Sequence, residues 1–229
     1  MPDGTDVTVT ANFEKATGIY IGKTPLKENT YYVVPESSGW SQDVVEASTT
    51  PTDNYALLTE DKTDGYTLTL HNFKYTGLGY EYEDSNFHHY AAIFANQDLT
   101  IHLEGNNSVT ESGNYNVDSY TTYGIYVVGG GLKVTGEGSL TATGGTSAYG
   151  GSFGVCVMNG SLTVSGAELT GKGGRGRDSR GVNATRITVQ EGGKLTGIGV
   201  DVDTGQSVGV YSESLTVSGG ELVAEGGKG

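Results

Sequence analysis

The stretch Leu162-Thr163-Val164 decides the fold of this chain, because close copies of it return along most of the sequence. The six copies are Leu68-Thr69-Leu70, Leu99-Thr100-Ile101, Leu132-Lys133-Val134, Leu162-Thr163-Val164, Ile187-Thr188-Val189 and Leu215-Thr216-Val217. Their leading residues are separated by 31, 33, 30, 25 and 28 residues. Self-similarity at this spacing indicates a repeat architecture, in which each repeat is one supersecondary unit.

Each repeat contains two further apolar segments. The second segment is Val109-Thr110, Leu140-Thr141, Leu169-Thr170, Leu195-Thr196 and Leu222-Val223 in successive repeats. The third is Ala91-Ala92-Ile93-Phe94, Gly124-Ile125-Tyr126-Val127, Gly154-Val155-Cys156-Val157, Gly181-Val182-Asn183 and Gly209-Val210-Tyr211. Apolar residues alternate with polar or variable ones in all three segments, which is the period of a β-strand.

Three strands per repeat predict an all-β fold, a parallel β-helix of about six coils. The first and third residues of each triplet then point inward and form apolar ladders from coil to coil. Parallel crossovers are almost always right-handed, so we expect a right-handed β-helix. A disordered chain of the same composition would not keep three apolar segments in register through five periods.

Residues 1–65 do not follow the repeat. Alternating segments at 6–10, 18–22 and 31–34 predict short strands, and a polar stretch follows them. The end of a solenoid exposes unpaired strand edges, so a covering segment is needed there. We therefore expect a β-rich N-terminal cap over residues 1–65 and the β-helix over residues 66–229.

Charge and cysteine content exclude several classes of protein. The chain has 13 basic and 27 acidic residues and a net charge of −14, which argues against nucleic acid or anionic membranes as partners. No apolar stretch is long enough for membrane insertion. The single cysteine, Cys156, excludes an internal disulfide framework. Because it lies between inward-pointing Val155 and Val157, we expect it to face outward or to lie near the surface, and to be inert.

The connections between the second and third strands vary most in length and content. Because coils stack in register, we expect these connections to form one ridge along the rod. The aromatic and cationic residues expected to contact a ligand are Tyr80, Tyr82, His88, His89, Tyr115, Tyr120, Arg175, Arg177 and Arg180, with Tyr126 pointing outward from the third strand. Aromatic rings stack on sugar faces and polar groups bind hydroxyls, so this composition favours a glycan.

Two structural alternatives compete with a ligand at these positions. Tyr-rich loops near the cap often pack on the cap itself, covering the open solenoid edge. Tyr90, Tyr123 and Phe153 occupy equivalent positions in their repeats, and a stacked aromatic ladder accounts for them without a ligand.

The pattern Asp201-x-Asp203-x-Gly205 resembles part of a calcium-binding loop, with oxygen ligands at alternate positions. The remaining ligands of such a loop are missing, and the Arg residues one coil earlier are competing partners for the same carboxylates. We expect no cofactor apart from a possible calcium ion. Paired carboxylates of the glycan-cleaving type are not evident on the outward strand positions, so the sequence favours a protein that is not an enzyme.

The segments that carry a family resemblance are Gly18-Ile19-Tyr20-Ile21-Gly22, residues 65–72, residues 90–106 and residues 123–136. With these segments the chain resembles the repetitive β-helical surface modules of anaerobic gut bacteria, often labelled carbohydrate-binding or adhesin-like. The resemblance implies a right-handed parallel β-helix, export and display at the cell surface. It carries over no functional residue, because the matching segments are core and turn positions.

The sequence thus predicts a non-catalytic extracellular module whose partner is a polysaccharide or surface glycan. The alternatives are a passive stalk or spacer, and a polysaccharide lyase or hydrolase. The sixth repeat has no third strand before Gly229, so we expect a fragment of a longer exported protein. Its open last coil would make end-to-end contacts in isolation.

Overall fold

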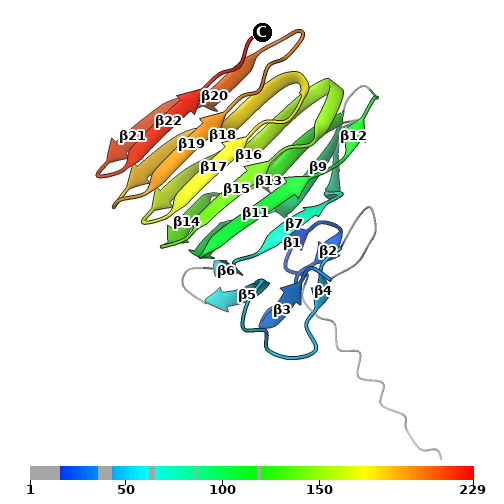
Figure 1. Ribbon diagram of the computed structural model, residues 1–229, viewed down its shortest axis with the longest axis vertical. Coiled ribbons are helices and arrows are strands. Elements are labelled where there is room, and N and C mark those ends of the chain that lie inside the picture. The colour runs from blue at the N-terminus through cyan, green and yellow to red at the C-terminus, as the bar shows by residue number, and fades with distance from the viewer. Residues whose placement is uncertain (1–15, 36–42, 62–64, 86, 118–119) are drawn as a thin grey trace, which may run out of the picture.

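The computed structural model describes residues 16–35, 43–61, 65–85, 87–117 and 120–229, and every regular element in them is a β-strand (Figure 1). The strands are β1 (Ile19–Ile21), β2 (Thr24–Pro25), β3 (Thr30–Val33), β4 (Val45–Glu46), β5 (Tyr55–Asp61), β6 (Gly65–His71), β7 (Lys74–Gly77), β8 (Tyr80–Asp84), β9 (Phe87–Ala95), β10 (Leu99–Glu104), β11 (Asn106–Glu111), β12 (Asn114–Tyr115), β13 (Tyr120–Val128), β14 (Leu132–Gly136), β15 (Ser139–Thr143), β16 (Thr146–Ser165), β17 (Glu168–Lys172), β18 (Gly176–Gln190), β19 (Lys194–Ile198), β20 (Ser207–Tyr211), β21 (Ser214–Ser218) and β22 (Glu221–Glu225). The strand expected at 6–10 lies outside the described residues.

Three ladders of parallel strands form the walls of a β-solenoid, as predicted. The first wall contains β6, β10, β14, β16, β18 and β21, and the second contains β7, β11, β15, β17, β19 and β22. The third wall contains β9, β13, β16, β18 and β20, since the long strands β16 and β18 turn a corner and serve two walls. The solenoid has about five turns, slightly fewer than the six expected, because the third wall has one strand fewer.

The repeated triplets form the core ladder of the first wall. Leu99, Leu132, Leu162 and Ile187 lie opposite one another in successive strands, and all are buried. The first triplet is an exception, because Tyr66 rather than Leu68 lies opposite Leu99. The shift of two residues keeps the same side chains inward, since strand side chains alternate with a period of two.

The second wall contains one polar residue within its ladder. Asn107, rather than Val109, lies opposite Leu140, and it is buried. Its Oδ1 accepts a hydrogen bond from the Phe73 amide at 2.8 Å, and its Nδ2 lies 3.1 Å from the Ser139 carbonyl oxygen. The amide side chain is therefore satisfied by backbone groups of both neighbouring coils, as a buried polar group requires.

A row of glycines lies where the third wall passes close to the second. Gly124, Gly154, Gly181 and Gly209 occupy the same position in β13, β16, β18 and β20. A Cβ atom added at Gly154 would lie 2.1 Å from the backbone nitrogen of Lys172, which belongs to the second wall. The two walls can approach this closely only because these positions carry no side chain.

The N-terminal strands cover the first coil by antiparallel pairing. β5 pairs with β6 at the edge of the first wall, and β3 extends this sheet outward from β5. β1 pairs with β9 at the edge of the third wall. Leu58, Ile19 and Ile21 are buried beneath this layer. The described part of residues 1–65 therefore packs on the solenoid as additional strands.

The opposite end of the solenoid is formed by β20, β21 and β22 (Figure 1). The core ladders reach this end with their last members open to solvent, and Leu215 is 45% exposed. Among the described residues, therefore, additional strands cover the N-terminal end of the rod and none covers the other end. In the part of the chain that the structure describes, no helix has the length and apolar character required to cross a membrane.

Candidate functional site

The connections between the second and third walls align from coil to coil. β12 pairs with the start of β16, which places Asn114 opposite Thr146, and β16 pairs with β18, which places Ser147 opposite Gly176. Backbone hydrogen bonds continue this alignment, from the Thr146 amide to the Gly113 carbonyl and from the Ser147 amide to the Arg175 carbonyl. The variable connections therefore form a ridge of short strands along one edge of the solenoid.

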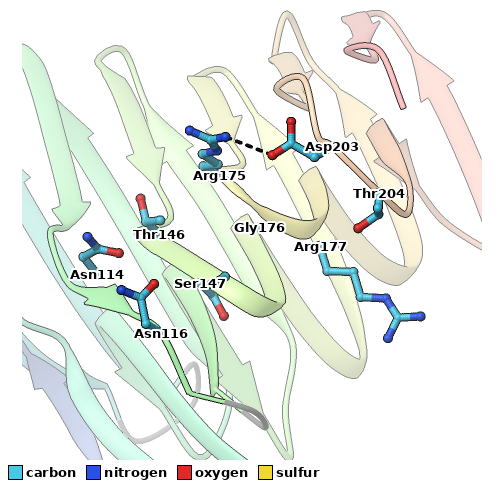
Figure 2. Close-up of a pocket in the computed structure, with 10 residues that line it drawn as sticks. Asn114, Asn116, Thr146, Ser147, Arg175, Gly176, Arg177, Asp203 and Thr204 are labelled. Atoms are coloured by element: carbon cyan, nitrogen blue, oxygen red, sulfur yellow. Dashed lines mark hydrogen bonds and ion pairs between the residues drawn. The ribbon is translucent and has the colours of Figure 1, made fainter.

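A groove of about 340 Å³ runs across this ridge (Figure 2). Four successive coils line it, with Asn114, Asn116, Thr146, Ser147, Ala148, Arg175, Gly176, Arg177, Asp203 and Thr204. Its volume lies at the lower end of the range of about 300–1,000 Å³ typical of small-ligand pockets. Amide, hydroxyl and guanidinium groups dominate the lining, which suits a ligand rich in hydroxyl groups.

Several polar side chains in the groove have no partner among the described residues. Arg175 Nη2 forms an exposed ion pair with Asp203 Oδ2 at 2.9 Å, shown in Figure 2. Within the described residues, the side chains of Asn116, Thr146 and Arg177 make no hydrogen bond or ion pair. The groove therefore offers unused donors and acceptors from neighbouring coils, held in position by the paired backbone beneath them.

Stacked aromatic rings lie in the first two coils, at the N-terminal end of the ridge, and one of them belongs to Tyr115, whose chain neighbours Asn114 and Asn116 line the groove. Tyr115 stacks on Tyr90 with ring centroids 4.3 Å apart, and Tyr120 stacks on His88 at 4.7 Å. The rings of Tyr90 and Tyr120 are nearly parallel, with an interplanar angle of 8° and centroids 5.6 Å apart. We call these four residues the aromatic stack. All four are half-buried, so parts of their rings remain accessible at the ridge.

Carboxylates fix the aromatic stack from two sides. Glu81 Oε1 accepts a hydrogen bond from the Tyr90 hydroxyl at 2.8 Å and lies 2.9 Å from His88 Nδ1. The hydrogen bond from Tyr90 lowers the pKa of the Glu81 carboxyl. From beneath, the Tyr115 hydroxyl lies 3.1 Å from Glu111 Oε1. The rings are therefore preorganised before any ligand binds, which reduces the entropic cost of binding.

Glu111 is an almost fully buried carboxyl group, with 1% of its surface exposed. Besides the Tyr115 contact, its Oε1 accepts hydrogen bonds from the Gly113 and Gly79 amides at 2.9 and 3.3 Å. Its Oε2 is buried and has no hydrogen-bond partner within the described residues. Burial raises the pKa of Glu111 above its ordinary value of 4.5.

The raised pKa of Glu111 gives a pH dependence with a defined sign. Its contribution to stability is complete below pH 4.5 and is lost as the pH rises through the raised folded-state pKa, because the buried carboxylate must then be charged. Glu111→Gln keeps an acceptor for the same amides and does not titrate. We measure the free energy of unfolding of both proteins in urea over a range of pH. As the pH rises, the value for the wild type should fall relative to that for the variant. A difference independent of pH would contradict this.

Tyr80, Tyr82, His89 and Tyr126 form a separate cluster on the outer surface of the third wall. The hairpin of β8 and β9 folds Tyr82 to within 5.2 Å of the Phe94 ring and 6.3 Å of the Tyr126 ring. Tyr80 stacks on Tyr20 of the N-terminal strands at 3.9 Å. At this end of the ridge, packing against the cap accounts for the tyrosines, as the alternative interpretation predicted.

The expected accessibility of Tyr126 was wrong. Its side chain points outward from the solenoid core but is only 2% exposed, because Tyr82 and His89 lie over it. Burial lowers the pKa of His89, and its Nδ1 lies 2.9 Å from the Tyr123 hydroxyl. These residues form a second, outer hydrophobic layer on the third wall rather than a surface for a ligand.

The aromatic ladder on this wall is shorter than predicted. Tyr123 stacks on Phe153 at 5.2 Å, but Tyr90 lies opposite Thr122 and belongs to the aromatic stack instead. Phe153 is followed in the ladder by Arg180, whose guanidinium carbon lies 4.6 Å from the ring centroid of Tyr211. Arg180 is therefore separated from the groove that Arg175 and Arg177 line.

Cys156 faces outward from the solenoid core, as expected, and it is nevertheless buried. It is 2% exposed, within the same outer layer as Tyr123 and Tyr126. Asn183 Nδ2 lies 3.4 Å from its sulfur. Burial raises the pKa of the Cys156 thiol to about 12, so the reactive thiolate is disfavoured.

The two aspartates considered as calcium ligands have protein partners. Asp203 pairs with Arg175, the competing interpretation weighed from the sequence, and Asp201 Oδ1 accepts a hydrogen bond from the Lys228 amide at 2.7 Å. No group of three or more His, Cys, Asp or Glu side chains in the described residues is placed to hold a metal ion. Calcium binding by Asp201 and Asp203 stays a prediction.

The amides and hydroxyls of the groove were missed in the sequence. A signal for them exists, because Gly113, Gly145 and Gly174 each precede a polar residue of the ridge, namely Asn114, Thr146 and Arg175. The residue that follows each of these glycines lines the groove, and the three residues are aligned from coil to coil.

Comparison of the chain with protein-family models, with curated proteins and with solved structures finds no match. The resemblance drawn from the sequence is therefore supported at the level of fold alone, as an all-β chain containing a β-solenoid of about five turns.

Proposed function

We propose that this chain is a non-catalytic glycan-binding module that holds a polysaccharide or surface glycan along the ridge. One observation supports the proposal: polar side chains from four successive coils, several of them unpaired within the described residues, line a groove on the same ridge as the aromatic stack. Sugar rings pack on aromatic faces, while their hydroxyls exchange hydrogen bonds with amides and guanidinium groups. A linear glycan lying along the ridge would contact the aromatic stack with one part of its length and the groove with the next.

The proposed setting is extracellular display on a cell surface, as part of a longer protein. Individual carbohydrate contacts are weak, and display of many copies on one surface raises the effective concentration of sites. The acidic composition and the rigid, repeating backbone suit such a setting. The rival functions are a passive stalk, which needs no ligand, and a polysaccharide-cleaving enzyme.

A glycan-array screen with purified protein tests the proposal, with Arg177→Ala as the variant. Arg177 lines the groove and is unpaired within the described residues, so its loss should weaken binding of any glycan found by about tenfold. Arg186→Ala is the matched control, because Arg186 is also exposed but donates to Ser161 outside the groove. Affinity for the control should stay within about twofold of the wild type.

The same screen separates the rival functions. No binding to any glycan would favour the passive stalk and contradict the proposal. Equal losses in the Arg177 and Arg186 variants would place any binding elsewhere on the chain. Released oligosaccharide after incubation with the bound polysaccharide would show an enzyme instead.

A further inference from the structure

The parallel pairing between β16 and β18 is irregular where the two strands border the groove. The aligned pairs on either side of the irregularity are Ser147 with Gly176 and Gly151 with Asp178. Residues 148–150 of β16 therefore face a single residue of β18, Arg177. A bulge of this kind redirects side chains, and bulges are frequent next to functional sites.

The bulge presents an open aromatic ring to solvent. Tyr149, at its centre, is 59% exposed, and Ala148 directly before it lines the groove. The tyrosines of the aromatic stack pack on one another, but the Tyr149 ring makes no aromatic contact within the described residues. A free ring face in this position can pack against the face of a sugar ring.

Arg177, opposite the bulge, carries a positive charge that no described residue neutralises. Asp203 is paired with Arg175, and Asp178 Oδ1 accepts a hydrogen bond from the Gln206 amide at 3.0 Å. Figure 2 shows the Arg177 side chain extending away from both Arg175 and Asp203. A guanidinium group offers parallel donors that match the paired oxygens of a carboxylate or sulfate group.

The other end of the ridge carries the opposite charge. In β8, Glu81 accepts the hydroxyl of Tyr90, and exposed Glu83 lies opposite His88 of the aromatic stack. Tyr115 and Gly176 occupy aligned positions two coils apart, about 10 Å along the rod. A ligand that reaches from the aromatic stack to Arg177 therefore meets negative charge at one end and positive charge at the other.

On the basis of the proposed glycan binding, we infer that the glycan carries one anionic sugar residue, carboxylated or sulfated, that binds at the bulge. The ring of this sugar packs on Tyr149, and its acid group binds Arg177. Neutral sugars of the same chain lie over the aromatic stack. A uniformly charged polysaccharide is disfavoured, because it would place further acid groups beside Glu81 and Glu83.

Calorimetric titration with matched oligosaccharides tests the inference. The panel contains oligosaccharides in which one uronic acid is flanked by neutral sugars, each with its carboxyl-reduced form and a form carrying sulfate instead. The wild type should bind an acidic form at least about fivefold more tightly than the reduced form. The tighter of the carboxylated and sulfated forms identifies the acid group. A polymer of uronic acid alone should bind no better than the reduced form.

Two variants separate the charge from the ring. Arg177→Gln keeps a polar side chain without the charge, so it should abolish the preference and leave affinity for the reduced form within about threefold. Tyr149→Ala should weaken the acidic and reduced forms alike, by about fivefold. Arg186→Gln and Tyr211→Ala are the matched controls, because both residues are exposed outside the groove, and neither should change the preference or the affinity.

Each contrary outcome has a defined meaning. Equal binding of the acidic and reduced forms by the wild type overturns the anionic subsite but leaves the proposed glycan binding in place. A preference that survives Arg177→Gln, or an affinity unchanged by Tyr149→Ala, places the sugar elsewhere and also overturns the subsite. No binding of any oligosaccharide in the panel contradicts both the subsite and the proposed function.

Discussion

Substituting Gly154 by Ala is expected to lower the free energy of unfolding by about 3 kcal/mol or more. A Cβ atom at this position would lie 2.1 Å from the Lys172 backbone nitrogen, 2.5 Å from the Gly171 carbonyl carbon and 2.6 Å from the Gly181 carbonyl oxygen. All three are backbone atoms of paired strands, so no flexible side chain can move aside. Relief requires the second and third walls to separate locally, which breaks packing in two coils.

Urea unfolding of the purified variant measures this effect, and Gly192→Ala is the matched control. Gly192 has φ of +75° and no atom within 4 Å of its added Cβ, so only backbone strain of about 1–2 kcal/mol is expected there. A Gly154 variant no less stable than the Gly192 variant would show that the walls do not approach as described.

Substituting Leu162 by Ala is expected to cost about 2–5 kcal/mol of unfolding free energy, the usual range for a leucine in a closed core. Leu162 is fully buried between Leu132 and Ile187 of the adjacent coils, so its loss leaves a cavity with walls on all sides. Neither neighbour can move into the cavity without breaking its own ladder contacts.

The same substitution at Leu215 is the internal comparison. Leu215 belongs to the same ladder but is 45% exposed at the open end, so Leu215→Ala should cost about 1 kcal/mol or less. Both variants are compared with the wild type by urea unfolding at a protein concentration where the chain is monomeric. Equal losses at the two positions would contradict the difference in burial between the coils.

The solenoid could be predicted from the sequence because its core residues recur as triplets with apolar first and third positions. The triplets around Leu132, Leu162 and Ile187 fix both the strand and the side that faces inward. The pattern was less reliable in the first coils. Tyr66 replaces the expected Leu, and Asn107 is a buried amide whose partners are backbone groups of neighbouring coils. Nothing in the local sequence marks such a residue as buried.

The candidate site was predicted less completely, because a sequence pattern says which side chains point outward but not what lies over them. Tyr126 and Cys156 do point out of the solenoid, yet both are buried in a second, outer layer, to which the β8–β9 hairpin contributes Tyr82 over Tyr126. The alignment of the connections could be foreseen from the repeat. The groove could not, since it depends on which side chains four successive coils bring together at the ridge.

The pairing of each coil with the next has a mechanical consequence for a protein stretched by its ends. Backbone hydrogen bonds between coils run along the length of the rod, so tension between the two ends loads them in series. The covered N-terminal end resists this tension with antiparallel strands, whereas the last coil is held by its single neighbour on each wall. Extension should therefore begin at β20, β21 and β22 and continue backward, releasing 25 to 33 residues per coil. Such a chain yields in steps and lengthens under load, while the coils nearest the N-terminal strands stay folded longest.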